Sequence, residues 1–198
     1  MSQNLGKTDI QVCDRKYNIS GVSTFEYTKI VGLENIEFGT NIIIDDFVFI
    51  YAKKKVRIGS YVHIASFTSI TGGDSFIMED FSGLSSGVRI FTGSDDFKEW
   101  GFGNCTIEEK YRNTERAPIH IGKFCVIGAN SVILPGVSVG EGATVAANST
   151  ITKNLEPWGT YIGNRKMGDR DKEGVLNNYQ RYLLELNEKS KAYSISKE

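Results

Sequence analysis

A small set of residues has side chains that could move a proton or bind a polar ligand. The chain has two histidines, His63 and His120, and histidine exchanges a proton readily near neutral pH. Three aspartates, Asp74, Asp95 and Asp96, stand in glycine- and serine-containing segments. Aspartate is a weak base at its usual pKa of about 3.9, but its carboxylate binds hydroxyl and ammonium groups. These residues therefore favour proton transfer by histidine and ligand binding by aspartate.

The three cysteines, Cys13, Cys105 and Cys125, indicate neither a metal site nor a redox pair. They lack CxxC spacing, and two histidines are too few for a three-histidine metal centre. We therefore expect no metal. The N-terminus has no apolar signal region and no apolar run reaches the length of a membrane span, so we expect a cytoplasmic protein.

Acidic and basic residues nearly cancel, with 23 Lys and Arg against 24 Asp and Glu. This balance gives no reason to expect nucleic acid or an anionic membrane as a partner. The length of 198 residues suits one domain with short appendages.

A six-residue period indicates the elements that must position these side chains. Aliphatic residues recur at Ile121, Ile127, Ile133, Val139, Val145 and Ile151. A second inward-facing column is predicted four residues after each, at Cys125, Ser131, Val137, Ala143, Ser149 and Leu155. Weaker hexads extend back to Phe38. This period is typical neither of a helix nor of a simple strand, and it predicts a stack of coils built from short strands.

Three insertions interrupt the upstream hexads. Two steps are longer than six residues, around Lys53-Lys54 and Gly72-Gly73, and residues 92–118 interrupt the repeat after Ile90. If three hexads make one turn of a triangular coil, all three insertions fall on one edge. A site built along that edge is therefore expected, and it would include the three aspartates.

We predict an all-β fold, a parallel β-helix of about five coils over residues 38–164 with a loop insertion at 92–118. Residues 1–37 would form an N-terminal cap with irregular strands, and residues 165–198 a helical tail. Within the tail, Leu176, Tyr179, Leu183 and Leu186 have helical spacing. Because an open coil exposes unpaired backbone groups, we expect a helix over residues 173–190 to fold back as a cap.

The segment IGKFCVIGANSVILPGVSVGEGATVAANSTITKNLEPWGTYIGN, residues 121–164, resembles the left-handed β-helix acyltransferases. It is most similar to sugar O- and N-acetyltransferases of the galactoside and maltose acetyltransferase type. The resemblance implies a left-handed coil, acetyl-CoA as cosubstrate, and a homotrimer with active sites between subunits.

The resemblance also assigns the cofactor-binding residues. Backbone amides of small residues contact the pantetheine arm in this family, and Ala129 and Ala147 match them. Thr152 and Lys153 match the family's cofactor-contacting pair. Basic residues that follow the last coil are expected to meet the phosphates: Arg165, Lys166 and Arg170. Relatives usually read Gly-Asn-Pro-Ala where this chain has residues 163–166, Gly-Asn-Arg-Lys, so the adenine end is expected to sit differently.

Acyl transfer needs a base and a donor for the oxyanion. The base of galactoside acetyltransferases is a histidine just after the strand that leads into the long loop, and Asp95 stands there in this chain. His63, at a corner near the expected acceptor cleft, and Asp95 are therefore the catalytic candidates, with His120 weaker. The expected substrate-binding residues are Asp74, Ser94, Asp96 and Trp100. Loop aromatics such as Trp100 could stack on a sugar or anchor the loop to a neighbouring subunit.

The resulting hypothesis is an acetyl-CoA-dependent acetyltransferase that transfers the acetyl group directly to a sugar or nucleotide-sugar acceptor. The main interpretation is O-acetylation of a glycan or sugar hydroxyl in surface polysaccharide synthesis. The alternative is N-acetylation of a nucleotide-linked amino sugar, which the missing loop histidine favours slightly because a free amine is already nucleophilic. A non-catalytic β-helix scaffold is less favoured, since it would lack the large insertion.

Overall fold

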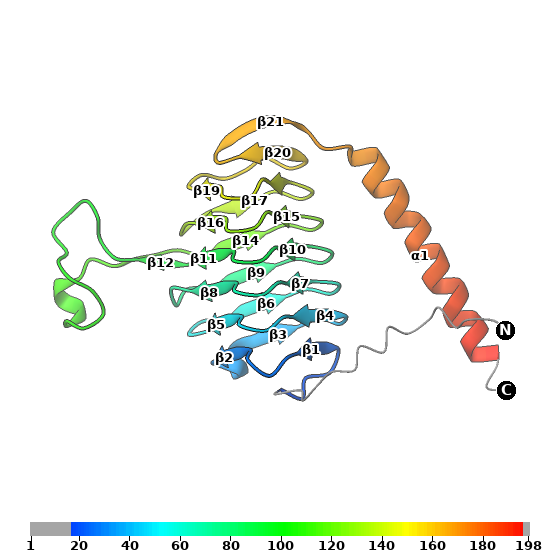
Figure 1. Ribbon diagram of the computed structural model, residues 1–198, viewed down its shortest axis with the longest axis horizontal. Coiled ribbons are helices and arrows are strands. Elements are labelled where there is room, and N and C mark those ends of the chain that lie inside the picture. The colour runs from blue at the N-terminus through cyan, green and yellow to red at the C-terminus, as the bar shows by residue number, and fades with distance from the viewer. Residues whose placement is uncertain (1–16, 196–198) are drawn as a thin grey trace.

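The computed structural model describes residues 17–195, with side chains described through Glu188. Cys13 therefore lies outside the described residues. The chain winds into a parallel β-helix, and one long helix lies beside the stack (Figure 1). Three sheets form the faces of this coil.

The first sheet contains seven parallel strands and one antiparallel strand at its end. Its strands are β1 (Val22–Thr24), β4 (Ile42–Ile44), β7 (His63–Ile64), β10 (Gly83–Leu84), β15 (Val126–Ile127), β18 (Thr144–Val145), β20 (Gly159–Ile162) and the antiparallel β21 (Arg165–Asp169). One parallel strand comes from each turn, so the stack has about seven turns. The expected count of about five coils was too low.

The second and third sheets complete the triangle. The second consists of β2 (Lys29–Val31), β5 (Phe49–Tyr51), β8 (Ser69–Thr71), β11 (Arg89–Phe91), β16 (Val132–Ile133) and β19 (Thr150–Ile151). The third consists of β3 (Ile36–Phe38), β6 (Val56–Ile58), β9 (Phe76–Met78), β14 (Ile119–Ile121) and β17 (Ser138–Val139). Two short 3-10 helices lie outside the sheets, at Leu33–Asn35 and Glu109–Tyr111.

Three edges join these faces, and we name them by the sheets that they connect. Edge 1, between the first and second sheets, includes residues 25–27, 45–47, 65–67, 85–87, 128–130 and 146–148. Edge 2, between the second and third sheets, includes residues 52–55, 72–75, 92–118, 134–137 and 152–154. Edge 3, between the third and first sheets, includes residues 39–41, 59–62, 79–82, 122–125, 140–143 and 156–158. All three insertions lie on edge 2, as the hexad count predicted.

The hexad columns fill the interior. Both columns predicted from Ile121 onward are buried, including the polar Ser131 and Ser149. Ser131 is satisfied internally, because its Oγ donates to the Ala146 carbonyl at 3.0 Å. The buried aliphatic residues of successive coils form one continuous core, which holds the three edges in fixed positions relative to one another.

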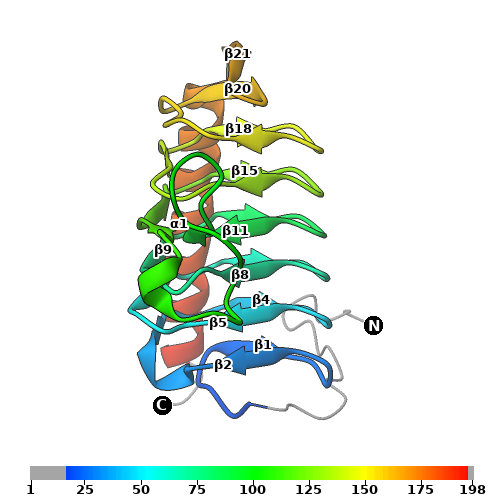
Figure 2. The ribbon, with the colours of Figure 1, turned by 90° about the vertical axis from the view of Figure 1, so that its left-hand side faces the viewer.

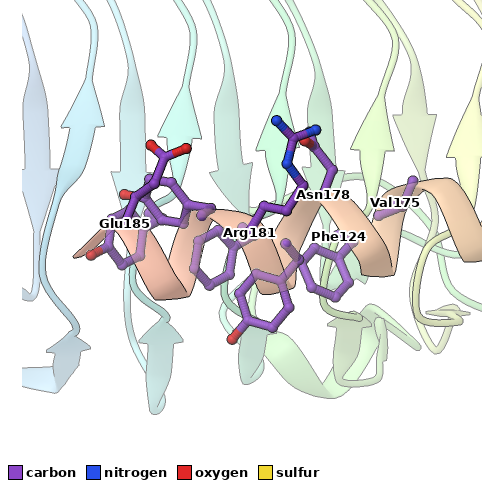
Figure 3. A pocket seen from close by; sticks show the side chains of 9 residues that line it. Phe124, Val175, Asn178, Arg181 and Glu185 are labelled. Atoms are coloured by element: carbon purple, nitrogen blue, oxygen red, sulfur yellow. The ribbon is translucent and has the colours of Figure 1, made fainter. Parts of the chain in front are cut away.

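The C-terminal helix α1 (Lys172–Ile195) lies along edge 3 instead of over the open end (Figures 1 and 3). Tyr179 packs edge-on against Phe81 and Phe124, and Tyr182 against Tyr61 and Phe81. These contacts with the aromatic side chains of edge 3 hold the helix against the side of the stack. The expected cap over the last coil is wrong, and β21 pairs with the last strand instead.

Cys125 provides a test of the inward column. Its thiol is buried and approaches the Gly140 carbonyl at 3.1 Å, and burial raises its pKa to about 12. Because the thiolate is the reactive form, we expect iodoacetamide at pH 8 to label the exposed Cys105 and to spare Cys125 until the chain unfolds. Peptide mass mapping checks this, and equal labelling of both cysteines in the folded protein would contradict the inward placement.

No helix within residues 17–195 combines the length and apolar character needed to cross a membrane.

Candidate functional site

The insertion on edge 2 leaves the stack as a two-stranded hairpin. Strands β12 (Gly93–Ser94) and β13 (Glu115–Arg116) pair antiparallel, and the segment between them projects away from the coils on the side opposite α1 (Figures 1 and 2). The base of the hairpin is closed by the Ala117 amide, which donates to the Thr92 carbonyl at 3.1 Å. The insertion is therefore a separate structural unit on a closed stem.

Asp96 organises the outer part of this loop. Its carboxylate accepts hydrogen bonds from the backbone amides of Lys98, Glu99 and Gly101, each at 2.8 Å, and from Asn113 Nδ2 at 3.0 Å. These donors hold the pKa of Asp96 far below its usual range. Most of its acceptor capacity is used inside the loop, so the geometry indicates a loop-ordering role instead of the expected ligand role.

Asp95 is the carboxylate that remains available. Its Oδ1 accepts a hydrogen bond from Arg112 Nη2 at 3.0 Å, and its side chain is 39% exposed. Ser94 lies beside it and donates from Oγ to the Asp95 carbonyl at 3.1 Å. The loop cavity beside them has a volume of about 470 Å³ and is lined by Ser94, Asp95, Asp96, Phe97, Lys98, Glu99, Asn113 and Glu115. Carboxylates dominate this lining, which suits a ligand with hydroxyl or ammonium groups.

The other two expected substrate ligands lie outside this cavity. Asp74 accepts hydrogen bonds from Lys54 Nζ at 2.8 Å and from the Ser75 amide at 2.7 Å. The Lys54 ammonium and the Ser75 amide lower the pKa of Asp74. Trp100 is 63% exposed and does not line the cavity. Asp74 thus holds two stacked turns of edge 2 together, and Trp100 presents its indole outward.

The two histidines lie on faces away from the loop cavity. His63 is on the first sheet, where its Nε2 is 3.0 Å from Asp45 Oδ2. His120 is on the third sheet, where its Nε2 is 2.9 Å from Glu79 Oε1 and its Nδ1 is 3.4 Å from Ser138 Oγ. The structure does not bring His63 and Asp95 into one cavity of the same chain, because one lies on the first sheet and the other on the insertion of edge 2.

Backbone amides of edge 1 form a row of available donors. Asn148 N donates to the Ala129 carbonyl at 2.8 Å, which fixes Ala129 and Ala147 on consecutive turns, roughly 4.8 Å apart. Among the described residues, no acceptor pairs with the amide N–H of either alanine. Ala147 is exposed and Ala129 is half-buried, and their small side chains would not obstruct an extended ligand.

The remaining cofactor candidates are divided among the edges. Thr152 and Lys153 are exposed on edge 2, and Asn164 bonds Thr152 through both its Oδ1 and its Nδ2, at 2.9 and 2.7 Å. Arg165 and Lys166 are exposed on β21, where Lys166 Nζ is 2.8 Å from Asp169 Oδ1. These four residues lie at the same end of the stack as Ala147.

Arg170 has a structural environment that the sequence did not reveal. Its Nη1 donates to the Phe124 carbonyl at 2.6 Å and to the Gly142 carbonyl at 3.1 Å. Both carbonyls belong to edge 3, so the guanidinium ties the start of α1 to that edge and is not directed toward the amides of edge 1.

Several polar residues at these sites were not singled out from the sequence. Asn113 and Glu115 line the loop cavity, and Asp45 pairs with His63. Neither Asn113 nor Asp45 belongs to a motif, and their partners are fourteen to eighteen positions away in the chain. Within residues 17–195, no group of three or more His, Cys, Asp or Glu side chains is arranged to hold a metal ion.

The parallel coil of hexads with one long insertion defines a hexapeptide-repeat protein. The model for the hexapeptide repeat of succinyl-transferase matches residues 118–153. A dTDP-4-amino-4,6-dideoxy-D-glucose acyltransferase of Escherichia coli is 32% identical over 133 residues, which cover 67% of this chain and 69% of that protein. The chain belongs to the hexapeptide-repeat acyltransferases and is an acyltransferase that acts on sugars.

Other relatives differ in the acceptor named for them. AntD, an N-acyltransferase from Bacillus cereus, was solved in complex with dTDP and 3-hydroxybutyryl-CoA. It aligns with a TM-score of 0.80 and 34% identity over 84% of this chain and 89% of that one. WbbJ of E. coli K12, a putative lipopolysaccharide biosynthesis O-acetyl transferase, is 31% identical over 65% of this chain and 60% of its own length.

Proposed function

We propose that this protein transfers an acyl group from acyl-CoA to the amine of a nucleotide-linked amino sugar. The observation that carries the proposal is Asp95, a partly exposed carboxylate held by Arg112 on a cavity that contains no histidine. A carboxylate suits an ammonium group, and a free amine needs less help from a base than a hydroxyl does. The likeness to AntD and to the E. coli dTDP-amino-sugar acyltransferase supports the same acceptor class.

The donor would lie along edge 1. The free amides of Ala129 and Ala147 can donate to the carbonyls of a pantetheine arm. Lys153, Arg165 and Lys166 place cationic groups at that end of the stack, where phosphates would lie. Structures of AntD that contain CoA or an acyl-CoA support this donor.

Transfer would proceed in one step through a ternary complex. The acceptor nitrogen attacks the thioester carbonyl carbon, an N–C bond forms, the C–S bond breaks and CoA leaves as the thiolate. Asp95 accepts the proton that the nitrogen releases, and Arg112 keeps the carboxylate in place. Cys125 is no candidate for a covalent intermediate, because its thiol is buried with a raised pKa.

Within a single chain the two halves of this site lie apart, because Asp95 is on edge 2 and Ala129 and Ala147 are on edge 1. We therefore propose a homotrimer in which the loop of one subunit reaches edge 1 of its neighbour. Large apolar side chains on the outer face of the second sheet support such contacts: Val31, Phe49 and Tyr51. A cytoplasmic location, expected from the sequence, fits a nucleotide-linked acceptor.

O-acetylation of a sugar hydroxyl is the second candidate, and the paired His63 and Asp45 favour it. A carboxylate on one ring nitrogen orients an imidazole as a base for a hydroxyl, and here the carboxylate bonds Nε2 and leaves Nδ1 without a partner among the described residues. The likeness to WbbJ supports the same alternative.

Calorimetric titration with acetyl-CoA tests the donor site. We expect Lys153→Ala to weaken binding about tenfold, because a charge-assisted contact to phosphate contributes roughly 1.5–3 kcal/mol. Lys53→Ala is the matched control, an exposed lysine on the same edge several turns away, and it should leave binding unchanged. Absence of acetyl-CoA binding to the wild type would contradict the assignment of the donor site to edge 1.

The acceptor class is tested separately by CoA release. dTDP-4-amino-4,6-dideoxyglucose should support turnover, whereas the analogue with a hydroxyl in place of the amine should not. The reverse preference would establish O-acetylation and point to His63 as the base.

A further inference from the structure

Three aromatic rings form an exposed ladder on edge 1. Tyr27 and Phe47 stack with centroids 5.3 Å apart and an interplanar angle of 3°, and Phe47 and Phe67 stack at 5.2 Å and 2°. The three side chains are 57%, 52% and 57% exposed. One ring comes from each turn, so the spacing of the ladder follows the rise of the coil.

The aromatic ladder ends at Gly87, the corresponding position of the next turn, which has no side chain. We call this position the missing rung of the ladder. Gly87 occupies the next turn, in the left-handed region at a φ of 76°, as Phe47 and Phe67 do at 61° and 65°. Arg89 Nη1 donates to the Gly87 carbonyl at 2.9 Å and to the Phe67 carbonyl, which fixes the backbone around this rung. The outer face of the Phe67 ring therefore has no aromatic neighbour among the described residues.

On the turn beyond Gly87, the corresponding residue is Asn130, whose side chain ends in an amide group. The Gly87 amide donates to the Ser66 carbonyl and the Asn130 amide to the Ser86 carbonyl, both at 2.9 Å, so the gap lies between the turns of Phe67 and Asn130. Gly87 itself is buried, so a ring stacked on Phe67 would lie outward of its backbone, and the two-turn separation of roughly 9.6 Å would accommodate one such ring. The Asn130 side chain lies against Gly87, where its Oδ1 is 2.2 Å from the position that a Cβ at residue 87 would take. It makes no hydrogen bond within the described part of the chain, so its amide can pair with the polar edge of a heterocycle.

We propose that the missing rung is the site of the acceptor's nucleobase, a planar pyrimidine that stacks on Phe67 and presents its polar edge to Asn130. The inference rests on the proposed nucleotide-linked acceptor and adds where on the chain its base binds. A base at this rung lies one turn below Ala129, so the nucleotide would approach along edge 1 from the ladder side and the CoA thioester from the opposite side. Ser86, exposed beside the gap, lies where the two ligands would meet.

Filling the rung provides a direct test. Phe47 and Phe67 already adopt positive φ at this corner, so the backbone at position 87 tolerates a side chain. A Cβ there would lie 2.2 Å from Asn130 Oδ1, so Gly87→Phe has to turn the Asn130 side chain aside, and it would place a ring over Phe67. We expect it to abolish dTDP binding in calorimetry and to leave acetyl-CoA binding unchanged. Phe67→Leu should weaken dTDP binding at least about fivefold, since stacking of a base on an aromatic ring contributes roughly 1–3 kcal/mol.

The bottom of the same ladder supplies the matched control. Tyr27→Leu removes an equally exposed ring that lies two turns from the gap, and it should leave dTDP binding unchanged. Ribose 5-phosphate, which lacks a base, should bind equally to all variants. Equal dTDP affinity of the wild type, Phe67→Leu and Gly87→Phe would overturn the inference, as would a change of oligomeric mass in both Phe67→Leu and Tyr27→Leu, which would make the ladder a contact between subunits.

The test separates this inference from the proposed function. If dTDP binding depends on Phe67 but no amino sugar is acylated, the nucleobase site stands and the proposed reaction fails. If amino-sugar turnover is normal in Gly87→Phe, the reaction stands and the base binds elsewhere.

Discussion

Replacing Asp95 with asparagine is expected to lower kcat/KM for the amino-sugar acceptor about a hundredfold, within the range that a positioned proton acceptor contributes. Asparagine has the same size, and its Oδ1 can still accept the hydrogen bond that Arg112 gives at 3.0 Å. It cannot accept a proton or pair with an ammonium group. Steady-state CoA release measures the loss, and acetyl-CoA affinity should be unchanged because the donor would lie on edge 1.

His63→Asn is the control for this prediction. If Asp95 is the proton acceptor, His63→Asn should retain wild-type turnover, since His63 is on the first sheet and pairs with Asp45. Full activity of Asp95→Asn combined with at least a roughly tenfold loss in His63→Asn would transfer the base to His63.

Asp96→Ala is also expected to lower kcat/KM roughly a hundredfold, but through loss of loop order and not through loss of the proton acceptor. The substitution removes the acceptor for three backbone amides and for Asn113, so the loop cavity loses its shape and Asp95 its position. A displacement of about 1 Å in a catalytic group is enough for a loss of this size. Limited proteolysis should show new cleavage within residues 97–113, and the thermal unfolding of the coils should not change.

The matched variant for Asp96→Ala is Glu108→Ala. Glu108 is an exposed acid of the same loop that pairs with Lys110, and its loss should affect neither turnover nor proteolysis. Because hydrogen bonds hold the folded-state pKa of Asp96 well below its unfolded value, the ordering that it provides is present above pH 4 and is lost as the pH falls through that lowered pKa. Proteolytic protection of the loop should therefore persist at pH 5.

The sequence predicted the coils whose inward residues are aliphatic. It underestimated the number of coils because the inward residues of the outermost turns are of other types. Thr24 pairs in register with Ile44 and is fully buried, but a threonine does not continue an aliphatic column. The first turn, which begins at Val22, was therefore assigned to the N-terminal cap. At the other end, Tyr161 pairs with Val145 and closes the last turn with an aromatic residue.

The edge that bears the insertions was predictable because the chain returns to the same corner after every three hexads. The roles of Asp95 and Asp96 could not be predicted, because two adjacent aspartates differ only in the distant groups that donate hydrogen bonds to them. Arg112 pairs with Asp95 and Asn113 with Asp96, each across seventeen positions of the chain. No local period connects such partners, and the folded hairpin alone determines which carboxylate remains available.

The closed stem of the loop gives this fold a modular architecture. Beyond the insertion the strands resume as though the loop were absent, with Ile119 opposite Phe76 and Val132 opposite Arg89. Changes in the length or composition of the loop are thus not transmitted to the register of the coils. A lineage could exchange the loop and acquire a new acceptor while it keeps the amide row of edge 1, so acceptor preference can diverge among relatives faster than donor use.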